Sequence, residues 1–304
     1  MSYTFPSANT VLVFNLAGGT ETSKIPEPTL GAVPAPATAP RKPAEEAPRD
    51  KDAHIGELLA EVDAEAYKIA DIPENWNVSV PDETPVPSEP LEAPNCNTEK
   101  SVPVNVHQNP NPLALQVGSN GEVPRWKPGS VIKWNYFPSG WPGGETQARE
   151  VGEMMAQATL DWNKANIGVT FSPGTTLKEC TFVLGFNAAR TPLIAEAFFP
   201  NSNDLSYVNV YSQGIYSSWY KQLRAVFRHE LGHVLGLRHE FAMDPGSQYE
   251  GGSVQFGTRD AYSVMNYRDE PPTLTQKDID TARAFYAYTG EYIGSMPVRD
   301  YIPY

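Results

Sequence analysis

The chain has 304 residues, and its 36 acidic and 23 basic side chains give a formal net charge of −13. Residues 1–122 hold 18 of the acidic and 7 of the basic side chains, so most of the excess negative charge belongs to that region. No basic patch supports nucleic-acid binding. No apolar run approaches the length of about 20 residues that a membrane-spanning helix needs. We therefore expect neither a nucleic-acid partner nor a transmembrane segment.

The N-terminal region, residues 1–122, is also rich in proline, with 17 of the 29 prolines of the chain. An acidic, proline-rich segment buries too little apolar surface to offset the entropy lost on ordering, so we predict that it is largely extended or disordered. The exception is residues 52–70, where apolar residues at helical spacing predict a short amphipathic helix. This helix either packs on the neighbouring domain or belongs to a prosegment that covers the active site, because amphipathicity alone names no partner.

A globular domain is predicted for residues 123–290, with a C-terminal tail at 291–304. Runs of β-branched and aromatic residues predict strands at 130–137, 169–171, 181–186, 194–199 and 207–211. Helical periodicity predicts helices at 146–162 and from Ser217 or Ser218 to about Leu235. A last helix should begin at Thr275, with Asp278 completing a capping box. This order predicts an α+β domain in which two long helices pack on a twisted mixed sheet and an irregular lobe follows.

The most informative motif is HELGHVLGLRH at residues 229–239. On a helix, His229 and His233 lie one turn apart on the same face and can reach one ion, whereas Glu230 points elsewhere and can hold a water. Gly236 can adopt the left-handed conformation that ends a helix, after which the chain can return and present His239. Three protein ligands with an open fourth position are typical of a catalytic Zn²⁺ site.

This pattern, HExxHxxGxxH, resembles the zinc-binding motif of the metzincin metalloproteases over roughly residues 123–290. Glu240 directly after it and the sequence Ser-Val-Met-Asn-Tyr at 263–267 resemble the astacin branch. The resemblance implies that Met265 lies beneath the zinc in a Met-turn. It also implies that Tyr267 acts as a fifth ligand or as a hydrogen-bond donor.

A second segment resembles a different branch of the same clan. Residues 193–200, LIAEAFFP, are similar to the edge strand that binds substrate in matrixins. The resemblance implies that substrate-binding residues lie in this strand: Ala195, Glu196, Ala197 and Phe198. The chain departs from the astacins in its cysteines, because it has only Cys96 and Cys180 where that family usually has four in the catalytic domain.

These features predict a zinc-dependent endopeptidase acting on proteins or peptides. Zinc would lower the pKa of its bound water to about 7. Glu230 would accept the proton of that water as general base, and Tyr267 would stabilise the developing oxyanion. The alternative is a non-catalytic zinc-containing binding or adhesion module. We expect one catalytic Zn²⁺ and a monomer; the sequence does not indicate whether structural Ca²⁺ binds.

The cellular compartment is predicted less directly. The resemblance implies a secreted protein, but the apolar run Val11–Phe14 follows no cationic segment and makes a poor signal peptide, so a cytoplasmic location stays open. The compartment decides whether Cys96 and Cys180 form a disulfide or remain thiols, and a zinc-blocking thiolate at Cys96 is a third alternative. Glu240 either anchors a newly released N-terminus, as its resemblance to astacins implies, or is a surface carboxylate.

Overall fold

We describe a computed structural model of the chain, in which the described residues are 68–72, 76, 78–79, 98, 115–189, 191–244, 250–268 and 270–303. All of them belong to one compact unit, residues 50–304. The helix predicted at 52–70 lies outside the described residues except for 68–70, which are not helical. None of the helices in the described parts is long and apolar enough to cross a membrane.

A five-stranded mixed sheet forms the centre of the domain, with the strand order β4-β3-β5-β7-β6. Four strands are parallel, and β6 pairs antiparallel with β7 at the edge. The strands are β3 (Val131–Tyr136), β4 (Thr170–Pro173), β5 (Phe182–Asn187), β6 (Ala195–Glu196) and β7 (Ser206–Tyr211). All five strands that the sequence predicts are therefore present in this sheet.

The edge strand β6 is shorter than the predicted 194–199, because the residues after Glu196 leave the ladder. Phe198 packs against Phe182, with ring centroids 5.8 Å apart, and Phe199 lies edge-on to His233 at 5.7 Å. Both side chains therefore contact neighbouring aromatic rings beyond the end of the β-ladder.

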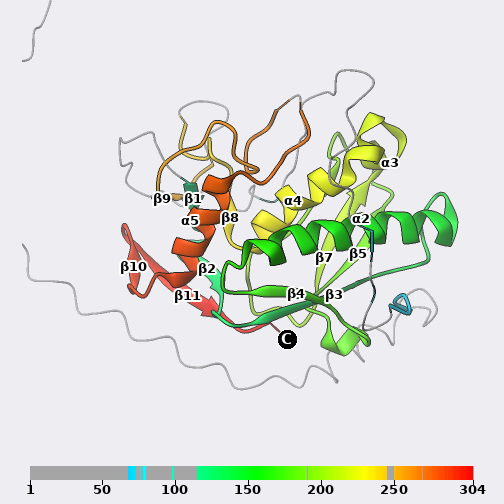
Figure 1. Cartoon of the computed structure of the whole chain (residues 1–304), viewed down its shortest axis with the longest axis horizontal. Helices are drawn as coiled ribbons and strands as arrows, with labels where there is room; N and C mark the ends of the chain where they lie inside the picture. Colours follow the sequence, from blue (N-terminus) through cyan, green and yellow to red (C-terminus); the bar gives the residue numbers. More distant parts are fainter. Residues whose placement is uncertain are drawn as a thin grey trace, which may run out of the picture. The chain divides into compact units, whose positions relative to one another are not determined.

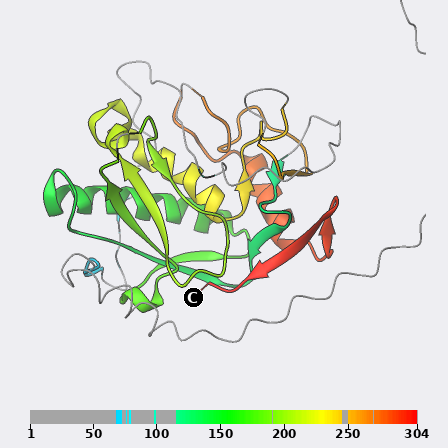
Figure 2. The same cartoon turned by 180° about the vertical axis from the view of Figure 1, so that it is seen from behind.

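Two long helices cover one face of this sheet, α2 (Gly144–Ala165) and α4 (Leu223–Val234). They lie in front of the sheet in Figure 1 and behind it in Figure 2. The buried stripe of α2 includes Val151, Met155, Ala158 and Trp162, as the helical periodicity predicts. The indole of Trp162 also donates a hydrogen bond to the carbonyl oxygen of Arg228 on α4.

The start of the predicted active-site helix differs from the expectation. Ser217 does cap it, since its hydroxyl accepts a hydrogen bond from the Trp219 amide at 3.1 Å. The first turn, however, is the 3₁₀ segment η3 (Ser218–Gln222), and the short helix α3 (Ser212–Tyr216) precedes it. Another 3₁₀ turn, η2 (Leu177–Glu179), lies between β4 and β5.

A polar contact joins α2 to α4 where both helices are largely buried. The carboxylate of Asp161 on α2 accepts hydrogen bonds from Arg224 and Arg228, which lie one turn apart on α4. The shortest of these bonds is 2.7 Å, and both arginine side chains are 9% exposed. Burial lowers the pKa of Arg228, and Asp161 opposes that shift. One carboxylate thus holds α4 against α2 through two cations.

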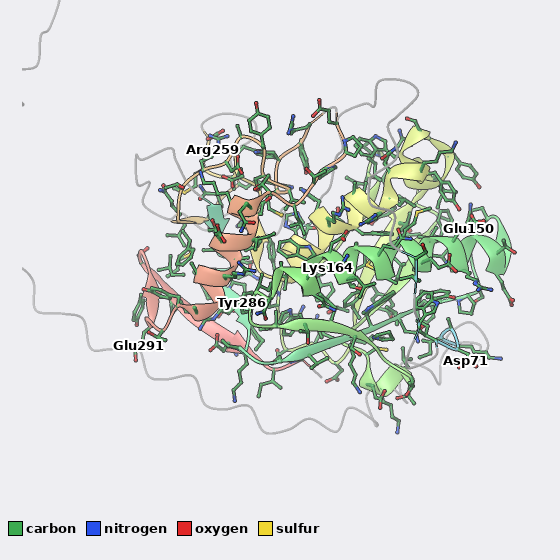
Figure 3. All side chains as sticks on the ribbon, in the orientation of Figure 1. Asp71, Glu150, Lys164, Arg259, Tyr286 and Glu291 are labelled. Carbon is green, nitrogen blue, oxygen red and sulfur yellow. The ribbon has the colours of Figure 1, made fainter. Side chains whose placement is uncertain are left out.

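The C-terminal part contains α5 (Gln276–Ala287), which begins at the predicted capping box. The Thr275 hydroxyl accepts from the Asp278 amide, and the Asp278 carboxylate accepts from the Thr275 amide. Tyr286, labelled on α5 in Figure 3, is buried and donates a hydrogen bond to the carbonyl oxygen of Leu235. This bond ties α5 to the C-terminal end of α4.

Two small sheets complete the described domain. One has the order β8-β1-β9, from β1 (Leu115–Val117), β8 (Leu237–Arg238) and β9 (Val254–Phe256). The other has the order β10-β11-β2, from β2 (Val123–Trp126), β10 (Tyr292–Ile293) and β11 (Met296–Tyr301). Strands β1, β10 and β11 lie outside the predicted limits 123–290, yet β1 and β11 pair with strands inside them. The arrangement confirms an α+β fold with a twisted mixed sheet.

A short N-terminal segment also contacts the domain. The Ala70 amide donates to the carbonyl oxygen of Tyr136, and the Asn135 side chain donates to the carbonyl oxygen of Ala70. The Trp76 ring lies 6.4 Å from that of Trp134 and 6.3 Å from that of Tyr136. Part of the acidic N-terminal region is therefore packed on β3.

Candidate metal centre

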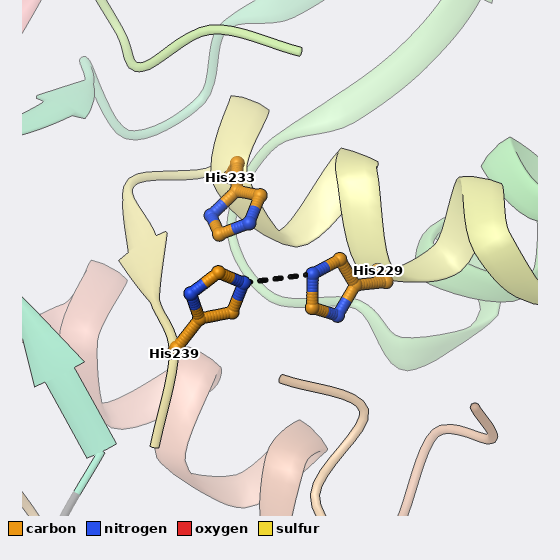
Figure 4. Close-up of side chains that lie close together, drawn as sticks. All are labelled: His229, His233 and His239. Carbon is orange, nitrogen blue, oxygen red and sulfur yellow. Dashed lines mark hydrogen bonds between the residues drawn. The ribbon is translucent and has the colours of Figure 1, made fainter. Parts of the chain in front are cut away.

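The three histidines of the motif meet at the C-terminal end of α4 (Figure 4). His229 and His233 come from successive turns of the helix, as the i and i+4 spacing predicts, with ring centroids 4.9 Å apart. His239 comes from the residue after β8, and its Nε2 lies 3.1 Å from Nε2 of His229. One ligand nitrogen from each ring lies within 4.8 Å of the other two, and all three residues are buried.

Gly236 makes the return of the chain possible. Its φ of +92° is in the left-handed region, as predicted, and a Cβ at this position would lie 2.4 Å from the carbonyl oxygen of Pro124. Both the backbone conformation and the close approach of β2 therefore require glycine. Strand β8 then runs against β1 and delivers His239 to the cluster.

In each of the three histidines, Nδ1 is the outer ring nitrogen, on the side away from the cluster, and it lies beside a hydrogen-bond acceptor. Nδ1 of His229 lies 2.8 Å from the carbonyl oxygen of Val264, and Nδ1 of His233 lies 2.8 Å from that of Leu237. Nδ1 of His239 lies 2.8 Å from Oε1 of Glu250. Carbonyl and carboxylate oxygens only accept hydrogen bonds, so each neutral ring carries its proton on Nδ1 and turns the lone pair of Nε2 inward.

Three converging lone pairs create a site for a cation. Without one, the Nε2 atoms of His229 and His239 would face each other across 3.1 Å with no proton between them. Zn²⁺ at about 2.0–2.1 Å from tetrahedral nitrogen ligands separates those ligands by about 3.3 Å. Burial lowers the pKa of His239 well below its usual value, with smaller contributions from His229 and Arg238, and so favours the neutral ring that a metal requires. The residues therefore fit a zinc ion.

Met265 packs against α4, the helix that carries His229 and His233. It is fully buried, and a Cβ on Gly232 would lie 2.3 Å from its sulfur atom. The glycine inside the HELGH sequence thus leaves the space that the methionine fills. The backbone carbonyl of Met265 also accepts a hydrogen bond from the amide of Glu240, the residue after His239.

Tyr267 lies beside the histidine cluster. Its ring centroid is 4.5 Å from that of His239 and 5.8 Å from that of His229. Phe241 packs against the rings of His239 and Tyr267, with centroids 4.7 and 5.0 Å away. The predicted site residues His229, His233, His239, Met265 and Tyr267 are thus close together.

Glu230 is buried and contacts a residue of the N-terminal region. The hydroxyl of Thr98 lies 3.5 Å from Oε2 of Glu230 and accepts a hydrogen bond from the Ala197 amide at 3.0 Å. This single side chain therefore connects the predicted general base to the predicted substrate strand.

The other residues of that strand occupy different surroundings. Ala195 is fully buried, and Phe198 packs into the aromatic cluster under the sheet. Glu196 accepts a hydrogen bond from the Tyr211 hydroxyl at 2.6 Å. Burial raises the pKa of Tyr211, and the bond to Glu196 and the charge of Glu230 add to that shift. Among the four predicted residues, Ala197 is the one whose amide donates to the Thr98 hydroxyl, which in turn contacts Glu230.

Two residues that support the cluster were not predicted in that role. Glu250 faces His239 from a segment without helical or strand periodicity, so the sequence carried no signal for it. Asp278 was predicted only as a helix cap. Its carboxylate also accepts hydrogen bonds from the Ser263 hydroxyl at 2.6 Å and the Val264 amide at 2.9 Å. The cap of α5 therefore holds the Met-turn.

Two further expectations have different outcomes. Glu240 is 2% exposed, so it is not a surface carboxylate, and its Oε2 has no hydrogen-bond partner among the described residues. Burial raises the pKa of Glu240 to about 7.

Cys180 is buried with its sulfur 3.3 Å from the carbonyl oxygen of Thr176, whereas Cys96 lies outside the described residues. The pairing of the two cysteines stays a prediction.

No protein-family model matches the chain, and no curated protein matches it in sequence. Among solved structures, the chain is similar to myroilysin, with 16% identity and a TM-score of 0.37 over 54% of this chain and 83% of that one. It is also similar to high choriolytic enzyme 1, a hatching enzyme zinc-protease from Oryzias latipes. That match has 15% identity and a TM-score of 0.34 over 57% of this chain and 94% of the other. Both similarities are low, so the conclusions below rest on the site itself.

Proposed function

We propose that the chain is a zinc-dependent endopeptidase of the metzincin type that hydrolyses peptide bonds in proteins or peptides. The observation that carries the proposal is the convergence of three inward-facing Nε2 atoms next to a buried glutamate. Three nitrogen ligands leave one position of a tetrahedral ion for water or substrate. A purely structural zinc site would use that position for a fourth protein ligand.

The proposed mechanism assigns one task to each nearby residue. Zinc, when bound by His229, His233 and His239, supplies Lewis-acid polarisation of the scissile carbonyl and a water of lowered pKa. Glu230 holds that water, accepts its proton and later delivers the proton to the leaving amine. Tyr267 donates a hydrogen bond to the oxygen on which negative charge develops.

The substrate would bind as an extended strand along β6. This strand is at the edge of the sheet, because β7 is its one neighbour in the sheet order. The Ala197 amide has a hydroxyl as its partner rather than a strand carbonyl. A peptide carbonyl could replace that hydroxyl and add a strand to the sheet. The Met-turn under Gly232 would keep the histidines in place while substrate binds.

We also propose that the N-terminal region inhibits the site as a prosegment. The support is Thr98, whose hydroxyl occupies two groups that turnover needs: the Ala197 amide for substrate and the Glu230 carboxylate for water. The segment near Ala70 and Trp76 packs on β3 and provides an anchor for that region. By family resemblance, we further propose that the protein is secreted, and we take a monomer as the default state.

The test is digestion of unfolded casein by the zinc-loaded chain, both full-length and shortened to residues 115–304, which begin at β1. Glu230→Gln is the matched control for each form, and the zinc content of all four proteins is measured. We expect cleavage at internal peptide bonds, inhibition by a hydroxamate, and loss of at least about a hundredfold in rate for Glu230→Gln, the scale of general-base catalysis. Zinc retained by the shortened chain with no cleavage would contradict the peptidase proposal and favour a non-catalytic binding module. Cleavage by the shortened chain but not by the full-length chain would support the inhibitory role of the N-terminal region.

A further inference from the structure

The three histidines differ in what holds their outer nitrogens. His229 and His233 each face a backbone carbonyl, which carries only a partial negative charge, whereas His239 faces a carboxylate. The distance is 2.8 Å in all three cases, so the difference lies in charge and not in proximity. A carboxylate raises the basicity of the imidazole that donates to it and fixes the orientation of the ring.

The carboxylate of Glu250 is held in place from both sides of its backbone. Its amide donates a hydrogen bond to the carbonyl oxygen of Ala242 at 2.7 Å, and its carbonyl oxygen accepts one from the Ser253 hydroxyl at 2.8 Å. The second carboxylate oxygen, Oε2, lies 3.8 Å from a guanidinium nitrogen of Arg238. The side chain is 17% exposed, so the backbone and Arg238, rather than bulk water, determine its position.

Arg238 is in turn fixed to the small sheet. Its Nη1 donates to the carbonyl oxygens of Gly118 and Gly251 at 2.8 and 3.0 Å. These contacts join the turn after β1 to the residue after Glu250. Arg238 thus connects the sheet β8-β1-β9 to Glu250 through an ion-pair contact of 3.8 Å, and Glu250 contacts the His239 ring.

The charges of the site favour this arrangement. A zinc ion with three neutral imidazoles carries a charge of +2 in a buried site, and low-dielectric surroundings make such a charge costly. The carboxyl groups of Glu250, which contacts His239, and of the buried Glu230, which follows His229 in the chain, would offset part of that charge when ionised.

We propose that Glu250 is a positioning residue for the metal, which holds His239 with Nε2 toward a bound divalent cation and strengthens that ligand. This inference rests on the zinc site of the proposed function but not on peptidase activity. Since His239 is the one ligand outside α4, it depends most on a partner that fixes its ring.

The test measures zinc affinity of the full-length chain by competition with a chelator of known affinity, without any substrate. We expect Glu250→Gln to weaken zinc binding by about 10- to 100-fold, the usual effect of removing a ligand's supporting carboxylate. Glu250→Asp keeps the charge on a shorter side chain and should give a smaller loss. Glu291→Gln, an exposed carboxylate directly before β10 and labelled in Figure 3, is the matched control and should bind zinc as the wild type does.

A second readout separates positioning from a purely structural role. Cobalt(II) in place of zinc should show an altered visible spectrum in Glu250→Gln, whereas the melting temperature of the metal-free protein should match that of Glu291→Gln. Zinc affinity within twofold of the wild type, or a loss explained entirely by unfolding of the metal-free variant, would overturn the inference. If the wild type binds zinc with the expected Glu250 dependence but cuts no substrate even after removal of residues 1–114, the peptidase proposal fails and this one stands.

Discussion

The half of the domain before Leu235 and the half after it support the same three histidines by different means. Before Leu235, regular elements with buried apolar stripes position the side chains, and α4 presents His229 and His233 at a spacing that any helix would give. After Leu235, irregular backbone carries the supporting groups, and polar contacts to β1 and α5 hold them. Disruption of the first half should therefore lower global stability, and disruption of the second should lower metal affinity more than stability.

The largest effect on stability is expected for Asp161→Ala, in the first half. The substitution removes the carboxylate that Arg224 and Arg228 both contact at the α2–α4 interface. Loss of one partner of a buried ion pair costs about 3–5 kcal/mol. We expect that decrease in the free energy of unfolding of the metal-free protein, measured with urea. Glu153→Ala, which removes an exposed ion pair with Arg149 on the same helix, should cost about 0.5 kcal/mol or less. Equal losses for the two variants would contradict the role of Asp161.

Asp278→Ala tests the second half. It removes the cap of α5 and the acceptor for the Ser263 hydroxyl and the Val264 amide. Loss of a cap and of charged hydrogen bonds should cost about 2–4 kcal/mol in unfolding free energy. Because the Val264 carbonyl faces Nδ1 of His229, we also expect weaker zinc binding, which Asp161→Ala should not show. Asp280→Ala, an exposed residue of the same helix, is the control for both measurements. A zinc affinity of Asp278→Ala equal to that of the wild type would show that the half after Leu235 does not support the metal site as proposed.

Gly232→Ala probes the contact where the two halves meet. The added Cβ would lie 2.3 Å from the sulfur of Met265, and overpacking of this kind costs about 1–3 kcal/mol. Thermal unfolding of the double variant Gly232→Ala/Met265→Ala should show a smaller loss than the sum of the single changes, since the smaller side chain makes room. Gly185→Ala, whose Cβ would meet its nearest neighbour at 3.5 Å, is the matched glycine control. Strict additivity in the double variant would show that Met265 does not fill the space over Gly232.

The smallest expected effect concerns the contact of Thr98 with Glu230 and the Ala197 amide. Thr98→Val keeps the shape and removes the hydroxyl, and a net hydrogen bond of about 1 kcal/mol corresponds to about a fivefold change. We expect the initial rate of casein cleavage by the full-length chain to rise by about that factor, and Thr98→Ser to stay near the wild type. An unchanged rate in Thr98→Val, with Glu230→Gln inactive, would remove Thr98 from the inhibitory role and leave the peptidase proposal intact.

The sequence predicted the site best where a local pattern determines the geometry. The i and i+4 histidines, the left-handed Gly236 and the capping box at Thr275 each depend on a few neighbouring residues, and all three have the predicted geometry. Residues that act at long range were missed. Glu250 reaches His239 across a turn of irregular backbone, and β1 finds β8 some 120 positions along the chain, as the bond from Arg238 to Gly118 shows.

Short elements were also missed for a physical reason. A strand of three residues such as β1 or β9 has too few positions for a period of two to be recognised, and pairing rather than propensity determines whether it forms. The strand predicted at 194–199 exists but is shorter, because pairing with β7 stops at Glu196 although the β-favouring residues continue to Phe199.

X-ray absorption at the zinc edge of the full-length, zinc-loaded chain would show directly whether the three histidines bind the metal. We expect one zinc per chain with three imidazole nitrogens at about 2.0–2.1 Å and one further light-atom ligand. A sulfur ligand near 2.3 Å would contradict it, since it would place a cysteine in the position needed for water or substrate. Loss of all bound zinc during dialysis, at a protein concentration where the three histidines should retain it, would contradict it equally.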